Sequence, residues 1–102
     1  MSKLPNDEVQ LAVKDLPGWR YFGNALHKEF RFTGFRAAIT FVDRVAEQAL
    51  TVRHYPDLEL HDARVIVSLS TRRDGGVSVK DVALAQAIER VTSDAGTPST
   101  AV

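Results

Sequence analysis

The spacing of apolar residues predicts one long helix in the middle of the chain. Between residues 34 and 53, apolar side chains recur every three or four positions, which is typical of one helical face. About 20 residues would form roughly 30 Å of helix. Phe41 and Leu50 lie off this face, so we expect a second apolar side that packs on another subunit. The predicted face comprises Phe35, Ala38, Ile39, Val42, Val45, Ala46 and Ala49.

Alternation of apolar and polar residues on both sides of this helix predicts four β-strands. Residues 26–32 alternate and follow a Gly-Asn turn pair at 23–24. Together with the preceding WRYF segment they predict a hairpin with one apolar face. After the helix, residues 58–61 and 65–70 alternate in the same way.

Two shorter helices are predicted near the ends of the chain. The first follows Pro5, and a Pro-Gly pair at 17–18 ends it. The last begins where Ser78 and Asp81 resemble a capping box, in which a side chain three positions into the helix satisfies free N–H groups. It continues with apolar residues at helical spacing to about residue 91.

The predicted order α-β-β-α-β-β-α is typical of an α+β domain, with a four-stranded antiparallel sheet and three helices on one face. We expect a single domain over residues 1–95. The small polar residues at 96–102 predict a flexible C-terminal tail. The edges of such a sheet can pair between subunits, so a homodimer or tetramer is expected.

Composition excludes several classes of function. The 102 residues carry 13 basic and 13 acidic side chains, so no net charge attracts nucleic acid or an anionic membrane. The absence of cysteine excludes disulfides, thiol nucleophiles and thiolate metal sites. No apolar run resembles a signal peptide or reaches the length of a membrane span, so we expect a cytoplasmic protein.

His54 is the first candidate for acid or base chemistry, because histidine titrates closest to neutral pH. An equally weighted alternative is a histidine that bonds the free carbonyls at a helix end. His27 and His61 fit a polar strand face better than a metal site, because metal sites need three or four converging ligands.

Hydroxyl and guanidinium groups lie together near the end of the last predicted strand. Ser68, Ser70 and Thr71 precede Arg72 and Arg73. This combination suits an anion or a polar heterocycle, although an ordinary polar surface has the same composition.

Several motifs spread over nearly the whole chain carry a resemblance to a known family. They are GW at 18–19, EFRFTGFRAAITFVDRVA at 29–46, HYP at 54–56, VSLST at 67–71 and KDVALA at 80–85. Together they resemble the pterin-4a-carbinolamine dehydratases. The resemblance implies an antiparallel sheet with helices on one side, assembled as dimers or tetramers. It also implies removal of water from a 4a-hydroxy-tetrahydropterin by histidines acting as acid and base, without metal or cofactor.

The family motif assigns roles to individual positions of this chain. His54 matches its first histidine and Asp81 its aspartate, so the resemblance implies that these two residues are catalytic. Five further residues are implied around a pterin pocket or its remnant. They are Trp19, Tyr55, Pro56, Thr71 and Arg72.

Three departures from the motif fall on the chemistry. Leu50 replaces a charged residue, while Tyr55 and Arg72 replace two histidines. Neither tyrosine nor arginine exchanges protons readily near neutral pH. The pattern resembles the branch of the family that includes the Rubisco assembly factor of α-carboxysomes. We therefore expect a non-catalytic assembly factor or chaperone, with Rubisco subunits as partner and a location at the carboxysome. The alternative is an active 4a-hydroxytetrahydrobiopterin dehydratase, with a pterin as its ligand.

Overall fold

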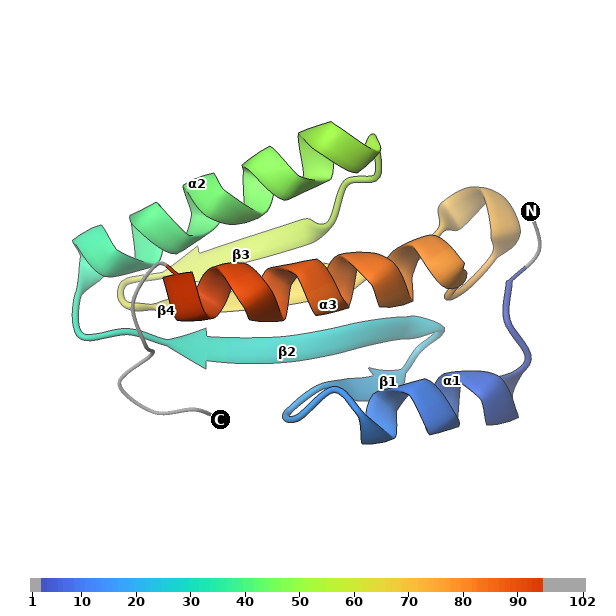
Figure 1. Cartoon of the computed structure of the whole chain (residues 1–102). Helices are drawn as coiled ribbons and strands as arrows, with labels where there is room; N and C mark the ends of the chain where they lie inside the picture. Colours follow the sequence, from blue (N-terminus) through green and yellow to red (C-terminus); the bar gives the residue numbers. More distant parts are fainter. Residues whose placement is uncertain (1–2, 95–102) are drawn as a thin grey trace.

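The computed structural model describes residues 3–94 and contains the predicted elements in the predicted order (Figure 1). The predicted tail at 96–102 lies outside these residues. One short 3₁₀ helix, η1, was not expected. The elements are α1 (Asn6–Lys14), β1 (Arg20–Phe22), β2 (Ala25–Arg31), α2 (Phe35–Val52), β3 (Asp57–His61), β4 (Arg64–Leu69), η1 (Arg72–Asp74) and α3 (Val79–Asp94).

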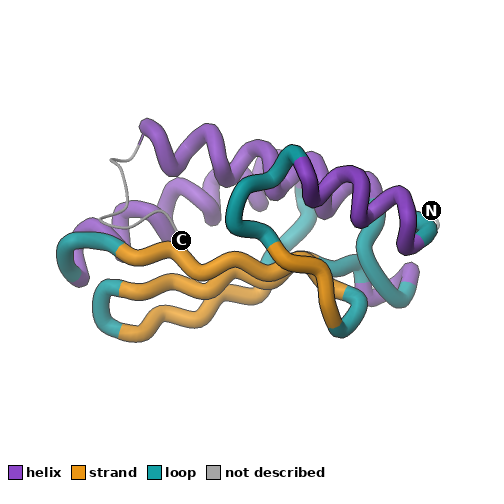
Figure 2. Tube along the Cα trace, turned by 90° about the horizontal axis from the view of Figure 1, so that it is seen from below, coloured by secondary structure: helices purple, strands orange, loops and turns teal. Residues whose placement is uncertain are grey.

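The four strands form one antiparallel sheet in the order β1-β2-β4-β3. The central pair, β2 and β4, is in register from Leu26 opposite Leu69 to Arg31 opposite Arg64. Figure 2 shows the helices on one side of the sheet. The predicted α+β fold class is confirmed. Of the helices in the described region, none is both long and apolar enough to cross a membrane.

The core lies between the sheet and the helices, because every second residue of β2 and β4 points toward α2 and α3. Leu26, Phe30, Val65 and Val67 are at most 2% exposed. Lys28 shares this buried side of β2, and its Nζ donates to a carboxylate oxygen of Glu89 and to the Pro17 carbonyl oxygen, both at 2.7 Å. The pairing offsets the cost of burying its charge.

Phe41 corrects the prediction of a second apolar side on α2. It is fully buried, with its ring centroid 4.6 Å from that of Phe30 and 5.0 Å from that of Phe32. Its steps of three residues from Ala38 and four residues to Val45 place it on the row that faces the sheet. The apolar spacing in the sequence therefore placed the buried face of this helix too far around its axis.

Leu50 does lie on the outer side of α2, as the spacing indicated. Its side chain is 65% exposed, and Phe35 and Val52 at the two ends of the helix are 55% and 49% exposed. The described chain therefore leaves three large apolar side chains of α2 in contact with solvent.

Candidate active site

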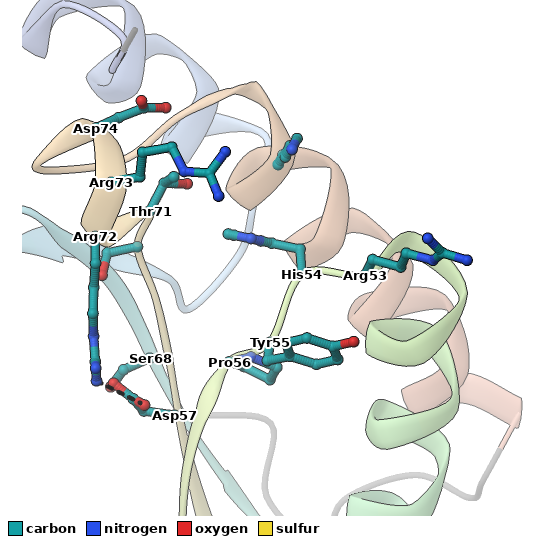
Figure 3. Close-up of a pocket in the computed structure, with 12 residues that line it drawn as sticks. Arg53, His54, Tyr55, Pro56, Asp57, Ser68, Thr71, Arg72, Arg73 and Asp74 are labelled. Atoms are coloured by element: carbon teal, nitrogen blue, oxygen red, sulfur yellow. Dashed lines mark ion pairs between the residues drawn. The ribbon is translucent and has the colours of Figure 1, made fainter. Parts of the chain in front are cut away.

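A polar pocket of about 460 Å³ lies where the C-terminal end of α2 meets the beginning of α3 (Figure 3). The beginning of β3, the end of β4 and η1 complete its walls. Its lining consists of Arg53, His54, Tyr55, Pro56, Asp57, Ser68, Ser70, Thr71, Arg72, Arg73, Asp74 and Lys80.

The end of α2 places His54 in this pocket. Arg53 adopts a left-handed backbone conformation with φ of 55°, which stops the helix. The next backbone N–H, that of His54, donates to the Ala49 carbonyl oxygen at 3.2 Å. Pro56 cannot continue a helix and leads directly into β3. The sharp turn carries the imidazole away from α2 toward the start of α3.

Asp81 is fully buried and holds the imidazole of His54. Its Oδ1 accepts a hydrogen bond from His54 Nε2 at 2.5 Å. Its Oδ2 accepts from Thr71 Oγ1 at 2.8 Å and from the Ser78 backbone N–H at 2.9 Å. The second of these bonds caps the first turn of α3, as the predicted capping box requires. Asp81 therefore fixes both the helix start and the histidine.

The bond to Asp81 decides which nitrogen of His54 is available for chemistry. An ionised carboxylate only accepts hydrogen bonds, so Nε2 carries the hydrogen and Nδ1 carries the lone pair. Nδ1 makes no hydrogen bond with the described residues, and among them no buried side-chain nitrogen or oxygen lacks a partner. Nδ1 is therefore accessible and can exchange a proton with a molecule in the pocket.

Thr71 supports the Asp81 carboxylate. Because its hydroxyl donates to Asp81, the 2.7 Å bond between Thr71 Oγ1 and Ser78 Oγ is donated by the serine. The hydroxyl hydrogens of Thr71 and Ser78 are thus both donated to acceptors within the protein. Thr71 is a positioning residue for Asp81 and, through it, for His54.

Tyr55 and Arg72 lie at the exposed mouth of the pocket. Their exposure is large, 62% for Tyr55 and 88% for the Arg72 side chain. The Tyr55 ring points away from Thr71, and Arg72 extends toward Asp57 (Figure 3). An Arg72 guanidinium nitrogen lies 3.6 Å from an Asp57 carboxylate oxygen. Neither side chain is part of the hydrogen-bonded group around Asp81.

Trp19, which the family resemblance implied at the pocket, lies in the core and is not among the residues that line the pocket in the described chain. It is 4% exposed, and its Nε1 donates to a Glu89 carboxylate oxygen at 2.9 Å. Its ring packs edge-on against Phe30 with centroids 6.3 Å apart. Trp19 lies directly before β1 on the buried side, where the packing of a large aromatic ring stabilises the fold.

Five residues of the site, Arg53 at the end of α2 among them, were not singled out as site residues from the sequence. Ser78 was recognised only as a cap, and that same motif is the signal for its bond to Asp81. Asp57, Asp74 and Lys80 line the pocket without any local signal. They come from β3, η1 and α3, whose convergence depends on the fold.

The other two histidines lie elsewhere, as their alternating pattern indicated. His27 Nδ1 lies 2.9 Å from Ser68 Oγ and its ring stacks on Phe22, with centroids 4.0 Å apart. His61 is exposed beside Glu59. Within residues 3–94, no group of three or more potential ligands is arranged to hold a metal ion.

Comparison with known proteins identifies the family of this chain. Residues 2–91 match the family model described as pterin 4 alpha carbinolamine dehydratase. The chain belongs to this family. A relative from Mycolicibacterium smegmatis, named "Putative pterin-4-alpha-carbinolamine dehydratase", is 39% identical over 94 residues, which cover 92% of this chain and all of that protein. This dehydratase family is the one that the sequence motifs resemble.

Two solved structures share the fold of this dehydratase-family protein. A transcriptional coactivator/pterin dehydratase from Brucella melitensis superimposes with a TM-score of 0.85 and 27% identity, over 88% of this chain and 98% of that one. A pterin dehydratase-like protein identified as a RuBisCO assembly factor in the α-carboxysome has a TM-score of 0.62 and 21% identity. The match covers 72% of this chain and 88% of that one. At 21% identity, the second likeness shows the fold alone.

The comparisons correct the expectation of a non-catalytic Rubisco assembly factor. Curated relatives that are 36–39% identical over most of the chain carry the name "Putative pterin-4-alpha-carbinolamine dehydratase", in one case with the number 2. The assembly factor is much more distant. The expectation gave too much weight to the changes at Tyr55 and Arg72, which lie outside the hydrogen-bonded group around Asp81.

Proposed function

We propose that this protein is a pterin-4a-carbinolamine dehydratase, a hydro-lyase that removes water from a 4a-hydroxytetrahydropterin. The observation that carries the proposal is the position of His54, whose imidazole lines a polar pocket while a fully buried carboxylate holds its second nitrogen. A histidine oriented in this way is a suitable general acid and base near neutral pH. The names of the relatives support the same activity.

The proposed reaction requires two proton movements. The hydroxyl on C4a must gain a proton so that it leaves as water, and the neighbouring ring nitrogen N5 must lose its proton as the C4a=N5 double bond forms. A single histidine can perform both steps in succession. Protonated Nδ1 of His54 donates to the leaving hydroxyl, and the resulting neutral Nδ1 then accepts the proton from N5.

This sequence leaves His54 in its starting state, and the only net change is the loss of one water molecule from the substrate. Asp81 stabilises the protonated imidazole and keeps Nε2–H directed away from the substrate. The proposal therefore needs neither Tyr55 nor Arg72 as a proton carrier. One positioned acid or base contributes about 10²- to 10⁴-fold, so we expect slower turnover than in a relative with more histidines.

The direct test is a dehydratase assay with the purified protein. A tetrahydropterin is converted to its 4a-hydroxy form, and formation of the quinonoid dihydropterin is followed with and without protein. We expect the protein to accelerate this step above the spontaneous rate in proportion to its concentration. A rate that is independent of protein concentration contradicts the proposal.

A further inference from the structure

Cationic side chains are concentrated at the pocket although the whole chain has no net charge. Arg53, Arg72, Arg73 and Lys80 line it, against the two carboxylates of Asp57 and Asp74, an excess of two positive charges. The buried Asp81 carboxylate behind His54 reduces the excess to one. The positive charge is thus a local property of this site.

Three of these cations, Arg53, Arg73 and Lys80, have no ion-pair partner within the described part of the chain. Arg72 lies near Asp57, but both side chains are strongly exposed, so their interaction is weak and exchangeable. The Arg53 guanidinium points away from His54 (Figure 3). Arg73 and Lys80 pair with none of residues 3–94. In Figure 3, Arg73 and the His54 ring extend toward the same space from different sides.

The position of Lys80 is unfavourable for folding. It lies in the first turn of α3, where the partial positive charge of the helix end disfavours a cation. Arg72 and Arg73 of η1 line the same pocket and add to the repulsion. Departures from local stability rules are expected at functional sites. An anion bound in the pocket would offset this repulsion.

We propose that this pocket takes a 4a-hydroxytetrahydropterin whose C6 substituent ends in an anionic group, a phosphate or a carboxylate. The inference rests on the proposed dehydratase function of the same site. The pterin ring lies against His54, and the anionic end lies against Arg73 and Lys80. The arginine binds a phosphate or carboxylate with two parallel N–H donors, and the lysine adds a point charge.

The test compares three substrates that differ only at the end of the C6 substituent. One is the 4a-hydroxy form of a tetrahydropterin with a dihydroxyalkyl group, the second carries a phosphate on its terminal hydroxyl, and the third carries a terminal carboxylate. We expect kcat/KM to be roughly tenfold higher for at least one anionic substrate than for the neutral one. The larger of the two ratios identifies the anion. Equal kcat/KM for all three substrates overturns the inference.

The double variant Arg73→Ala/Lys80→Ala assigns the preference to these side chains. We expect the ratio of anionic to neutral kcat/KM to fall close to one in this variant. Arg90→Ala is the matched control, because it removes an exposed cation from the same helix far from the pocket. The wild-type ratio should also fall as salt rises from 0.01 to 1 M, because exposed charges are then screened. If the ratio of anionic to neutral kcat/KM stays at its wild-type value in the double variant, the assignment to these two side chains is contradicted.

Binding of oxidised, unreactive pterins separates this inference from the proposed activity. Their fluorescence reports binding without turnover, with the terminal phosphate or without it. Tighter binding of the phosphorylated compound that is lost in Arg73→Ala/Lys80→Ala supports anion recognition even if no dehydration is detected. Dehydration of the neutral substrate without any preference for an anion in rate or binding leaves the proposed function intact and rejects the inference.

Discussion

His54 Nε2 and Asp81 Oδ1 lie 2.5 Å apart, although the two residues are separated by 27 positions in the sequence. The contact joins the end of α2 to the beginning of α3, the two helices whose ends meet at the pocket. It is supported from behind by Thr71 and by the Ser78 backbone. The orientation of the proposed catalytic histidine thus depends on three segments of the chain, the end of α2, the residue Thr71 after β4 and the start of α3.

Asp81→Asn tests the role of this contact. An amide can direct its NH₂ group at His54 while its oxygen still accepts from Thr71 and Ser78. The neutral histidine would then accept through Nε2 and carry its hydrogen on Nδ1, so Nδ1 could not accept the proton from N5. The variant would also lack the carboxylate that stabilises the protonated imidazole. We expect kcat to fall by about 10²- to 10⁴-fold. Urea denaturation should show a protein that still folds cooperatively. A variant that folds and retains wild-type kcat contradicts the orienting role.

Thr71 offers a finer test of positioning. Thr71→Val removes the hydroxyl that donates to Asp81 while keeping the shape of the side chain. We expect kcat to fall roughly tenfold, because the charge-assisted bond that holds the carboxylate is lost. Thr71→Ser keeps the hydroxyl and should remain close to wild type. Equal activity in the two variants shows that the hydroxyl is not needed.

Trp19→Phe tests whether this residue belongs to the core or to the pocket. The variant loses the bond from Nε1 to Glu89 and part of a ring that is 4% exposed. We expect the free energy of unfolding to decrease by about 1–3 kcal/mol, with kcat/KM unchanged. Chemical denaturation and the dehydratase assay measure the two quantities. An unchanged stability with a raised KM would instead place Trp19 in contact with the substrate.

Leu50→Glu tests self-association through α2. Leu50 is 65% exposed and Phe35 is 55% exposed, so their burial against another copy would be favourable. We expect the wild type to sediment as an oligomer and Leu50→Glu to lower its mass without loss of folding. Thr51→Glu is the control, because this exposed residue lies about 100° further around the helix. Equal masses for the two variants reject this surface as the contact.

The fold was predictable from the sequence because its main signals are local. The spacing at 34–53 predicted a helix that the structure places at Phe35–Val52. Alternation located the four strands, and the Ser78 and Asp81 pattern located the beginning of α3. Periodicity did not resolve which row of α2 is buried. Phe41 belongs to the core because the sheet approaches α2 from that side.

The site was less predictable because it is assembled from distant segments. The family motif pointed to His54, Asp81 and Thr71, which the fold brings together. It also pointed to Trp19, because a family motif alone does not distinguish a residue that lines the pocket from one that packs in the core. Lys80 had no signal, since its place beside η1 follows only from the arrangement of β4 and α3.

The most direct test of the account is the dehydration rate of the His54→Ala variant beside that of the wild type. The initial disappearance of a 4a-hydroxytetrahydropterin is followed at equal protein concentrations, with folding checked by circular dichroism. The account predicts that the wild type accelerates the reaction and that His54→Ala loses about 10²- to 10⁴-fold of this acceleration. Equal rates for the two proteins, or no acceleration by the wild type, would contradict it.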